Sequence, residues 1–484
     1  MTGHVYLIGI GGIGMSALAR WYNAHGCEVA GYDRQSTALT QALEQEGIAV
    51  DHTGDPKQLP QGLQKDLAAG NTNRWTVVWT PAVSREFGLM QAFVQAGFPL
   101  IKRAEALGQL TRNRPLLAIA GTHGKTTTST LLTHLLHATG VPVEAFLGGI
   151  ALGQESNLIL EAGDNTAPWI VAEADEYDRS FLQLTPDKAA ITSIEPDHLD
   201  IYGSPEKLVD AFIAFAGQVK PGGLLLHADV ADHLRTRRDA SSEWQGAAVY
   251  GPLDSRDTLD TKGWQAAYSN VHGSDGRAGF TLRMAGMADM PIRWSLPGAH
   301  NAANATAAAY LAVEAGVDPT RIPDALSSFQ GVARRFQVRH QDDQLTVIDD
   351  YAHHPSEIKG TIAAARIAYP GRRITGIFQP HLFSRTRDFM DAFAQALSTL
   401  DQCVLLPIYA ARENPMPGVD AQGIGDKMEG CPVECPPENR FLDVLEKLDP
   451  EVLLFMGAGD LDRWIGPALD RLTTGDTHVQ TDLP

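Results

Sequence analysis

Two glycine-rich loops, each placed between an apolar strand pattern and a helical pattern, constrain the fold of this chain more than any other feature. The first loop covers residues 9–14 and has the spacing G-x-G-x-x-G. The second covers residues 121–128 and resembles a P-loop, with Ile119 in place of the first glycine of that motif. In both patterns the backbone and a helix N-terminus can approach phosphate groups. The alternation of strands and helices around them predicts an α/β fold with doubly wound parallel sheets.

The length of the chain and the places of these motifs predict three domains. A chain of 484 residues corresponds to about three domains at roughly 150 residues each. We predict an N-terminal Rossmann-like domain over residues 1–111, a central P-loop ATPase-like domain over 112–322 and a C-terminal Rossmann-like domain over 323–484. Between residues 246 and 296, short alternating runs separated by turn residues predict an antiparallel sheet added to the central domain.

The composition excludes several classes of protein. The formal net charge is −19, which argues against a general nucleic-acid-binding or basic membrane-surface protein. No run approaches the roughly 18 apolar residues of a membrane helix, and the N-terminus has no signal-peptide pattern. Four cysteines are too few for a disulfide framework and suggest thiols in a reducing compartment. We therefore expect a cytoplasmic protein that binds neither nucleic acid nor a membrane.

The first loop, taken alone, allows more than one interpretation. It is followed by a strand pattern that ends just before Asp33, an arrangement typical of a nicotinamide or flavin nucleotide site. A tight strand-to-helix turn without a ligand is the alternative. The pattern itself indicates a diphosphate at a helix end and says nothing about hydride transfer.

Polar residues follow successive apolar strand patterns of the central domain. In the second loop, Lys125 is expected to reach the β- and γ-phosphates and the Thr126 hydroxyl to reach Mg²⁺. Glu173 follows the strand pattern at 169–172, and His198 lies in the acidic run that follows the next one. Both runs fall at the carboxyl edge of a parallel sheet, where ligands usually bind, although solvated acidic loops are the alternative. The loop residues expected to contact ATP are Gly121, Thr122, His123, Gly124, Lys125, Thr126 and Thr127.

Three polar clusters follow strand patterns of the C-terminal domain, at residues 349–355, 378–386 and 408–413. Each histidine or arginine taken singly is more often an ordinary surface residue. Three clusters at one sheet edge nevertheless predict a site for a small charged substrate opposite the nucleotide. The sequence thus predicts one domain for a diphosphate, one for ATP with Mg²⁺ and one for a substrate. This combination argues against a simple dehydrogenase.

Together these residues resemble the Mur ligase family of peptidoglycan synthesis over nearly the whole chain, and most closely its alanine-adding branch. The motifs that carry the resemblance are the first loop with Met15-Ser16, residues 120–128, Glu-Ala-Asp-Glu at 173–176, Asp197-His198, His300-Asn301 with Asn304, Arg334-Arg335-Phe336, residues 349–355 and Phe-Gln-Pro-His at 378–381. The resemblance implies that the carboxylate of UDP-N-acetylmuramate attacks the γ-phosphate of ATP. The amine of L-alanine then attacks the acyl phosphate, which leaves an amide, ADP and phosphate.

The resemblance also implies a role for particular residues. The catalytic set would be Lys125, Glu173, His198, His353 and Arg385, with His353 as a candidate proton acceptor. Two Mg²⁺ sites, which Mn²⁺ could also fill, would involve Thr126, Glu173 and His198. Across the nucleotide cleft, the ATP contacts would be Asn301, Asn304 and Arg335. The UDP-sugar contacts would be Gly11, Gly12, Gly14, Asp33, Ser84 and Arg103, and the amino-acid contacts would be Tyr351, His353, His381 and Arg385.

Some positions depart from the family pattern and keep alternatives open. Leu382 stands where several relatives carry an arginine, which puts one substrate contact in doubt. Other branches use a modified lysine at the position that Phe212 occupies here. In having phenylalanine there, the chain resembles the alanine-adding branch. Tyr177 stands where that branch often has serine; the murein-peptide recycling ligase, which joins a tripeptide to the same sugar nucleotide, has tyrosine. A nicotinamide-dependent oxidoreductase and a non-catalytic nucleotide-binding relative are more remote alternatives, since both leave the catalytic set without a role.

Overall fold

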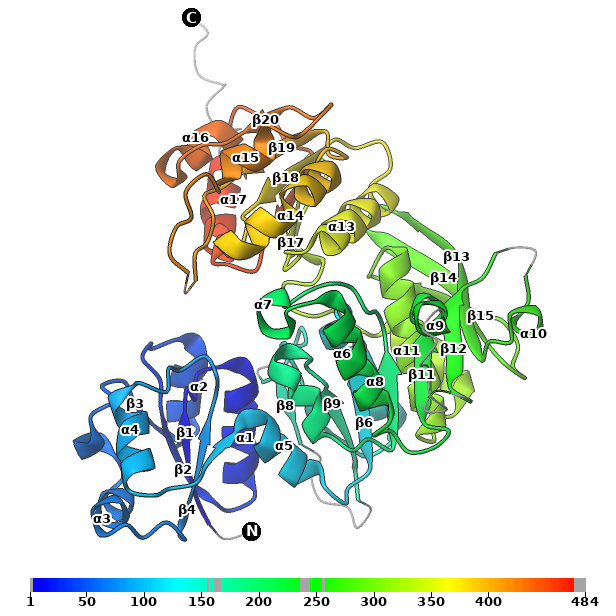
Figure 1. The fold of residues 1–484 in the computed structure, drawn as a ribbon. Coiled ribbons are helices and arrows are strands. Elements are labelled where there is room, and N and C mark those ends of the chain that lie inside the picture. The colour runs from blue at the N-terminus through cyan, green and yellow to red at the C-terminus, as the bar shows by residue number, and fades with distance from the viewer. Residues whose placement is uncertain are drawn as a thin grey trace, which may run out of the picture. The chain divides into compact units, whose positions relative to one another are not determined.

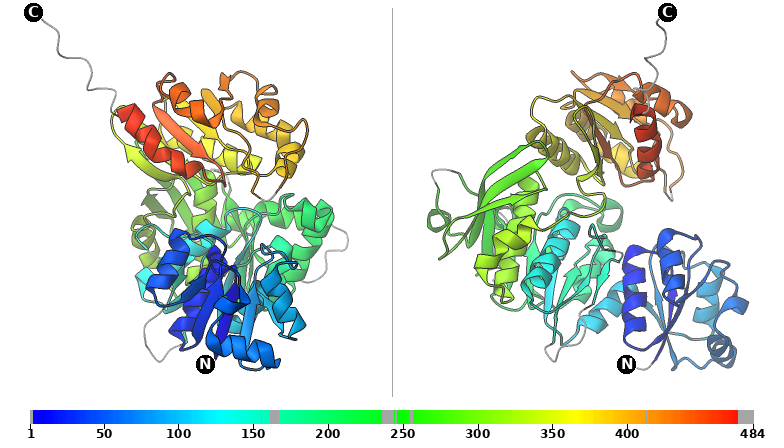
Figure 2. Two further views of the ribbon diagram at one scale, coloured as in Figure 1. Left: turned by 90° about the vertical axis from the view of Figure 1, so that its left-hand side faces the viewer. Right: turned by 180° about the vertical axis from the view of Figure 1, so that it is seen from behind.

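The computed structural model describes residues 3–154, 156–160, 167–235, 244, 246–254, 257–411 and 413–473. It divides into two compact units. The first unit contains residues 1–267, 282–289 and 303–326, and the second contains residues 268–281, 290–302 and 327–484. Figures 1 and 2 show that both units combine helices with twisted sheets, so the α/β fold class is confirmed.

The first unit begins with a parallel five-stranded sheet in the order β3-β2-β1-β4-β5. Its strands are β1 (His4–Ile8), β2 (Glu28–Tyr32), β3 (Ala49–Asp51), β4 (Trp75–Trp79) and β5 (Leu100–Lys102). Its helices are α1 (Ile13–Ala24), α2 (Ala38–Gln45), α3 (Gln61–Ala69), α4 (Gly88–Gln95) and α5 (Arg103–Thr111), with a 3₁₀ turn at Pro56–Gln58. Alternate residues of β1 pack into two different cores, Leu7 with α1 and Tyr6 with α4. The predicted βαβ unit is therefore confirmed, and the first glycine loop joins β1 to α1.

The central sheet of the first unit contains the strand that leads into the second loop. Its strand order is β12-β11-β10-β6-β9-β7-β8, and only the β7–β8 pair is antiparallel. The strands are β6 (Leu116–Ala120), β7 (Val143–Phe146), β8 (Leu158–Ile159), β9 (Trp169–Glu173), β10 (Lys188–Ile191), β11 (Leu224–His227) and β12 (Ala248–Pro252). The helices are α6 (Lys125–Thr139), α7 (Leu199–Tyr202), α8 (Pro205–Ala216), α9 (Ala228–Arg235) and α10 (Leu259–Lys262), with a 3₁₀ segment at Tyr177–Gln183. All five residues of β6 are buried, as expected for a strand in the middle of a parallel sheet.

Two of the next three strands and the two helices that follow them cross the boundary between the units in sequence, and the third strand lies in the second unit. The strands are β13 (Ala266–Ser274), β14 (Arg277–Met284) and β15 (Met290–Trp294), in the order β15-β14-β13; β13 begins beside β12 in the same sheet. The helices are α11 (Ala299–Glu314) and α12 (Ile322–Ser327), with a 3₁₀ turn at Pro319–Arg321 between them. The predicted additional sheet after the central strands is therefore present.

The second unit contains a six-stranded sheet in the order β16-β17-β21-β18-β19-β20, in which β16 alone runs antiparallel to its neighbour. The strands are β16 (Gln337–Gln341), β17 (Thr346–Asp350), β18 (Ile374–Phe378), β19 (Gln402–Leu405), β20 (Val433–Glu434) and β21 (Val452–Met456). The helices are α13 (Pro355–Ala368), α14 (Phe383–Leu397), α15 (Ala421–Gly425), α16 (Phe441–Leu445) and α17 (Ile465–Thr473), with 3₁₀ turns at Glu438–Arg440 and Leu461–Trp464. Two cores pack on opposite faces, one with α13 and α14 and the other with α16 and α17.

Among the helices of the described residues, none is long and apolar enough to cross a membrane.

Candidate active site

The second glycine loop joins β6 to α6 and needs glycine at two positions. Gly121 and Gly124 have φ angles of +135° and +81°, which side chains with a Cβ adopt at a cost. A Cβ at Gly121 would collide with the hydroxyl of Thr192, and a Cβ at Gly124 would lie 2.5 Å from Asn304 Oδ1. The structure therefore brings the loop together with Asn304, one of the predicted ATP contacts.

Lys125 lies at the first position of α6 and is folded back onto the loop. Its Nζ donates to the carbonyl oxygen of Gly121 at 2.7 Å and lies 2.8 Å from Glu176 Oε2. Burial lowers the pKa of Lys125, but the carboxylates of Glu176, Asp175 and Glu173 outweigh this effect and raise it to about 12. The ammonium therefore stays charged at neutral pH, as neutralising a phosphate requires.

Thr126 and Glu173 lie side by side next to Lys125. Thr126 Oγ1 donates to Glu173 Oε2 at 2.9 Å. A hydroxyl beside a carboxylate at the end of β9 is the set of hard oxygen donors that Mg²⁺ prefers, so these two residues fit the predicted metal. His198 lies near Glu176, with Nε2 3.7 Å from Oε1, and the ring of Tyr177 meets the His198 ring edge-on at 5.2 Å.

Glu176 was not predicted as a site residue, although it ends the Glu-Ala-Asp-Glu run that contains Glu173. It is 1% exposed and connects Lys125 with His198. Burial raises its pKa to about 7, and Lys125 opposes this rise. Its position one residue before the 3₁₀ segment could not be read from strand and helix patterns, because that segment contains non-helical residues.

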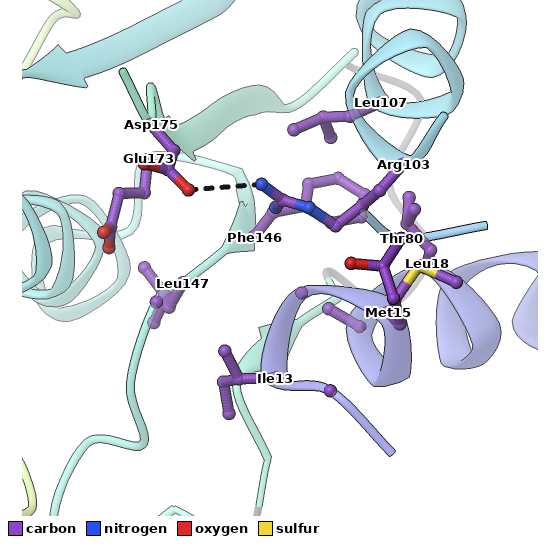
Figure 3. A pocket seen from close by; sticks show the side chains of 14 residues that line it. Ile13, Met15, Leu18, Thr80, Arg103, Leu107, Phe146, Leu147, Glu173 and Asp175 are labelled. Atoms are coloured by element: carbon purple, nitrogen blue, oxygen red, sulfur yellow. Dashed lines mark hydrogen bonds and ion pairs between the residues drawn. The ribbon is translucent and has the colours of Figure 1, made fainter. Parts of the chain in front are cut away.

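The first glycine loop opens into a pocket of about 270 Å³ that extends to Glu173 and Asp175. Figure 3 shows Arg103 pointing across this pocket towards Asp175, with Nη2 3.4 Å from Oδ2. A Cβ at Gly14 would lie 2.6 Å from Arg103 Nη1. Apolar side chains that were not predicted as ligand contacts line much of the rest of the pocket, namely Ile13, Met15, Leu18, Leu107, Phe146 and Leu147.

Three of the six predicted sugar-nucleotide residues line this pocket, and a fourth and a fifth contact each other beside them. Gly12, Gly14 and Arg103 line it, and Gly11 donates its N–H to Asp33 Oδ2 at 2.9 Å. Asp33 therefore contacts the loop itself. The Ser84 hydroxyl accepts the N–H of Glu86 at 3.1 Å, and Ser84 is not among the lining residues.

In the second unit, the ends of β17 and β18 bring three predicted amino-acid contacts together. The rings of Tyr351 and His353 are 5.4 Å apart, and those of His353 and His381 are 6.3 Å apart. The guanidinium of Arg335 lies 5.1 Å from the centre of the Tyr351 ring. His353 Nδ1 lies 3.0 Å from the Tyr351 carbonyl oxygen and 3.2 Å from a carboxylate oxygen of Glu357, and these two groups orient the imidazole.

The rest of this cluster includes residues that lie in the predicted polar runs but were given no individual role. The ring of Tyr409 stacks on that of His381 at 5.7 Å, and buried Gln379 donates to Asp460 Oδ1 at 3.2 Å. Leu382, one of the departures from the family pattern, has a left-handed φ of +69° directly before α14. Arg385 lies in the first turn of that helix. Arg412, part of the third cluster, lies outside the described residues.

Asn301 and Asn304 lie one turn apart on α11, which places them on one face of the helix. Asn301 is buried and donates to the carbonyl oxygen of Pro297 at 2.8 Å. The structure describes them in different units, so it relates only Asn304 to the second loop.

Models of three consecutive protein families match the chain. "Mur ligase family, catalytic domain" matches residues 4–115, "Mur ligase middle domain" 119–312 and "Mur ligase, glutamate ligase domain" 334–459. A UDP-N-acetylmuramate–L-alanine ligase of Cytophaga hutchinsonii is 41% identical over 465 residues, which are 96% of this chain and 95% of that protein. The chain belongs to the Mur ligase family. As a member it is an ATP-dependent, amide-forming ligase that acts on small molecules.

Further Mur ligases agree with this assignment. A UDP-N-acetylmuramate–L-alanine ligase of Porphyromonas gingivalis is 41% identical and covers 97% of this chain and 99% of its own length. The crystal structure of UDP-N-acetylmuramate-alanine ligase from Thermotoga maritima has a TM-score of 0.76 and 26% identity, with 97% of this chain and 99% of that chain covered. A murein peptide ligase from Psychrobacter arcticus, at 21% identity, shares the fold with a TM-score of 0.66 over 97% of this chain and 98% of its own.

Proposed function

We propose that this Mur ligase joins L-alanine to UDP-N-acetylmuramate and converts ATP to ADP and phosphate, as a step of peptidoglycan precursor synthesis. The observation that carries the proposal is the 41% identity, over almost the full length, to relatives named for this reaction. The arrangement of Lys125, Thr126 and Glu173 supports it, because phosphorylating a carboxylate brings two anions together and needs positive charge at that point.

The phosphoryl-transfer step would depend on the second loop. The loop from Gly121 to Thr127 binds the triphosphate of ATP, with Asn301, Asn304 and Arg335 as further nucleotide contacts. Lys125 neutralises the γ-phosphate as the muramate carboxylate attacks it. Thr126 and Glu173 would hold a Mg²⁺, and His198 would contribute to a second site; Mn²⁺ could replace Mg²⁺. When bound, the metal supplies Lewis-acid stabilisation of phosphate charge.

The two other substrates would bind at the first loop and at the cluster of the second unit. Gly11, Gly12 and Gly14 approach the diphosphate of the sugar nucleotide, with Asp33, Ser84 and Arg103 as further contacts. For L-alanine we propose the residues Tyr351, His353, His381 and Arg385, with Arg385 on the carboxylate. His353 accepts the proton of the amine, for which its contact with Glu357 at 3.2 Å orients it. We further propose that the domains are residues 1–111, 112–322 and 323–484.

A second candidate is the recycling reaction, in which a tripeptide replaces L-alanine. The observation that favours it is Tyr177, whose ring lies edge-on to His198 where the alanine-adding branch often has serine.

The test is phosphate release from ATP and Mg²⁺ with UDP-N-acetylmuramate, comparing L-alanine with L-Ala-D-Glu-diaminopimelate. Turnover with L-alanine supports the proposed function, and turnover with the tripeptide alone moves the chain to the recycling reaction. Absence of turnover with either amine contradicts both. Chelation of the metal should abolish release, and Mn²⁺ should restore it.

A further inference from the structure

We propose that Glu176 is a positioning residue that acts through Lys125. In the nucleotide-free protein it holds the ammonium on the loop, and the phosphates of ATP must compete with it for that ammonium. The inference rests on the proposed function only for the identity of the nucleotide. It explains why a carboxylate without a predicted role is buried against the lysine that phosphoryl transfer uses.

The contacts of Lys125 leave no donor for a phosphate. Its Nζ lies 2.9 and 2.8 Å from the two carboxylate oxygens of Glu176. It also donates to the carbonyl oxygens of Gly121 at 2.7 Å and Thr122 at 3.3 Å. Since an ammonium has three N–H donors, a phosphate oxygen can bind Lys125 only by replacing one of these partners.

Glu176 is the partner whose replacement matters most. Two of the three partners are neutral carbonyl groups, whereas Glu176 is a carboxyl group whose charged form Lys125 stabilises against the effect of burial. In that form it binds an ammonium through the same kind of charge-assisted contact as a phosphate. Its side chain is 1% exposed, so water screens the pair weakly. The Glu176 carboxylate therefore determines how readily a nucleotide phosphate binds the Lys125 ammonium.

The segment that carries Glu176 is fixed from several sides. The Tyr202 hydroxyl donates to the Glu176 carbonyl oxygen at 2.6 Å, and the guanidinium of Arg179 lies 5.0 Å from the Tyr202 ring. Asp178 and Arg179 have left-handed φ angles of 53° and 55°, and Lys102 Nζ binds Asp178 at 2.6 Å.

Strained backbone of this kind persists where the surroundings determine it, so Glu176 cannot follow Lys125 towards a phosphate. After the exchange it still has the His198 imidazole near it, at 3.7 Å.

The first experiment measures binding of a non-hydrolysable ATP analogue with Mg²⁺ to the full chain, without turnover. Glu176→Gln keeps the size of the side chain and removes its charge, and we expect affinity to rise about 3- to 10-fold. AMP, which lacks the β- and γ-phosphates, should bind within about twofold of its wild-type affinity. The matched control is Glu314→Gln, which removes the carboxylate of an exposed pair with Lys188 at 2.7 Å and should leave both affinities unchanged.

Two further variants show whether the effect runs through Lys125. In a Lys125→Met background, adding Glu176→Gln should change analogue affinity by less than about twofold. Glu176→Asp keeps the charge and should return affinity towards the wild-type value. If Glu176→Gln does not fold, Tyr202→Phe, which loosens the Glu176 segment, should shift affinity in the same direction by a smaller factor; unfolding midpoints check each variant.

Steady-state kinetics provide an independent readout. Glu176→Gln should lower KM for ATP about 3- to 10-fold without raising kcat, and KM for the sugar nucleotide should not change. Unchanged or weaker analogue binding by Glu176→Gln, or equal tightening in the Lys125→Met background, would overturn the inference. Absence of turnover with L-alanine would contradict the proposed function. It would not affect the inference about Glu176, because analogue binding is measured without an amine.

Discussion

The two glycine loops of the first unit have the same strand–loop–helix pattern, but different side chains surround them. The second loop carries a buried ammonium, Lys125, with Thr126 and Glu173 beside it. At the first loop, the side chain that accepts a backbone hydrogen bond is an acid, Asp33. A cation, Arg103, lies beside Gly14 and pairs across the pocket with Asp175 at 3.4 Å. Both backbones suit a phosphate group, and we propose that the side chains decide whether the phosphate is transferred or only bound.

The largest expected effect tests this difference at Lys125. Lys125→Met should lower kcat about a thousandfold, because the charge that stabilises the transferred phosphoryl group is lost. Binding of UDP-N-acetylmuramate, measured by calorimetry, should not change, since the first loop does not use this lysine. A weakened sugar-nucleotide affinity would mean that the two loops are not separate sites.

A smaller effect is expected at Arg103, a cation that lies beside Gly14 of the first loop. Arg103→Met should raise KM for UDP-N-acetylmuramate about 10- to 150-fold, since a hydrogen bond to a charged group contributes about 1.5–3 kcal/mol. KM for ATP should stay within about twofold. Lys65→Met is the control, because Lys65 is an exposed cation on α3 that does not line the pocket. Equal changes in both variants would remove the specific role of Arg103.

The glycines of the two loops should differ in the same way. Gly124→Ala places a Cβ at φ +81° and 2.5 Å from Asn304 Oδ1, so the free energy of unfolding should fall by about 1–2 kcal/mol and kcat/KM for ATP should fall about tenfold. Gly14→Ala lies within α1, where alanine is favoured over glycine by about 1 kcal/mol. Its Cβ would meet the flexible end of Arg103, so stability should hold while KM for the sugar nucleotide rises a few-fold. Denaturant unfolding measures the stability of each variant, and steady-state kinetics measure its KM values. Equal destabilisation by Gly124→Ala and Gly14→Ala would contradict the expected difference between the two loops.

The sequence predicted what depends on local pattern. Both loops, the strands around them and the pairing of Thr126 with Glu173 follow from hydrophobic periodicity and from the rule that ligands bind at the carboxyl ends of parallel strands. The expected strand at 374–378 coincides with β18. These features need no knowledge of distant contacts.

The residues that the sequence did not assign depend on long-range packing. Glu176 reaches Lys125 because the 3₁₀ segment after β9 is anchored by Tyr202 and Lys102, which lie far from it in sequence. Tyr409 joins the second-unit cluster because its backbone pairs with His381 as an isolated bridge. The same limit applies to Asp33, whose place after β2 indicated a ligand contact without indicating its bond to Gly11.

The smallest predicted effect separates two roles for Asp33. Its Oδ2 accepts the Gly11 N–H at 2.9 Å and its Oδ1 accepts the Gln35 N–H at 3.1 Å, so both oxygens already hold the chain around the loop. If this is its main role, Asp33→Ala should raise KM for the sugar nucleotide about 3- to 10-fold, the equivalent of one lost hydrogen bond. Asp33→Asn, whose amide oxygen can still accept from Gly11, should raise it less than about twofold. An equal rise in KM for both variants would instead indicate that the charge of Asp33 interacts with the sugar nucleotide. The first loop would then depend on a charged side chain for binding, as we propose that the second loop depends on Lys125.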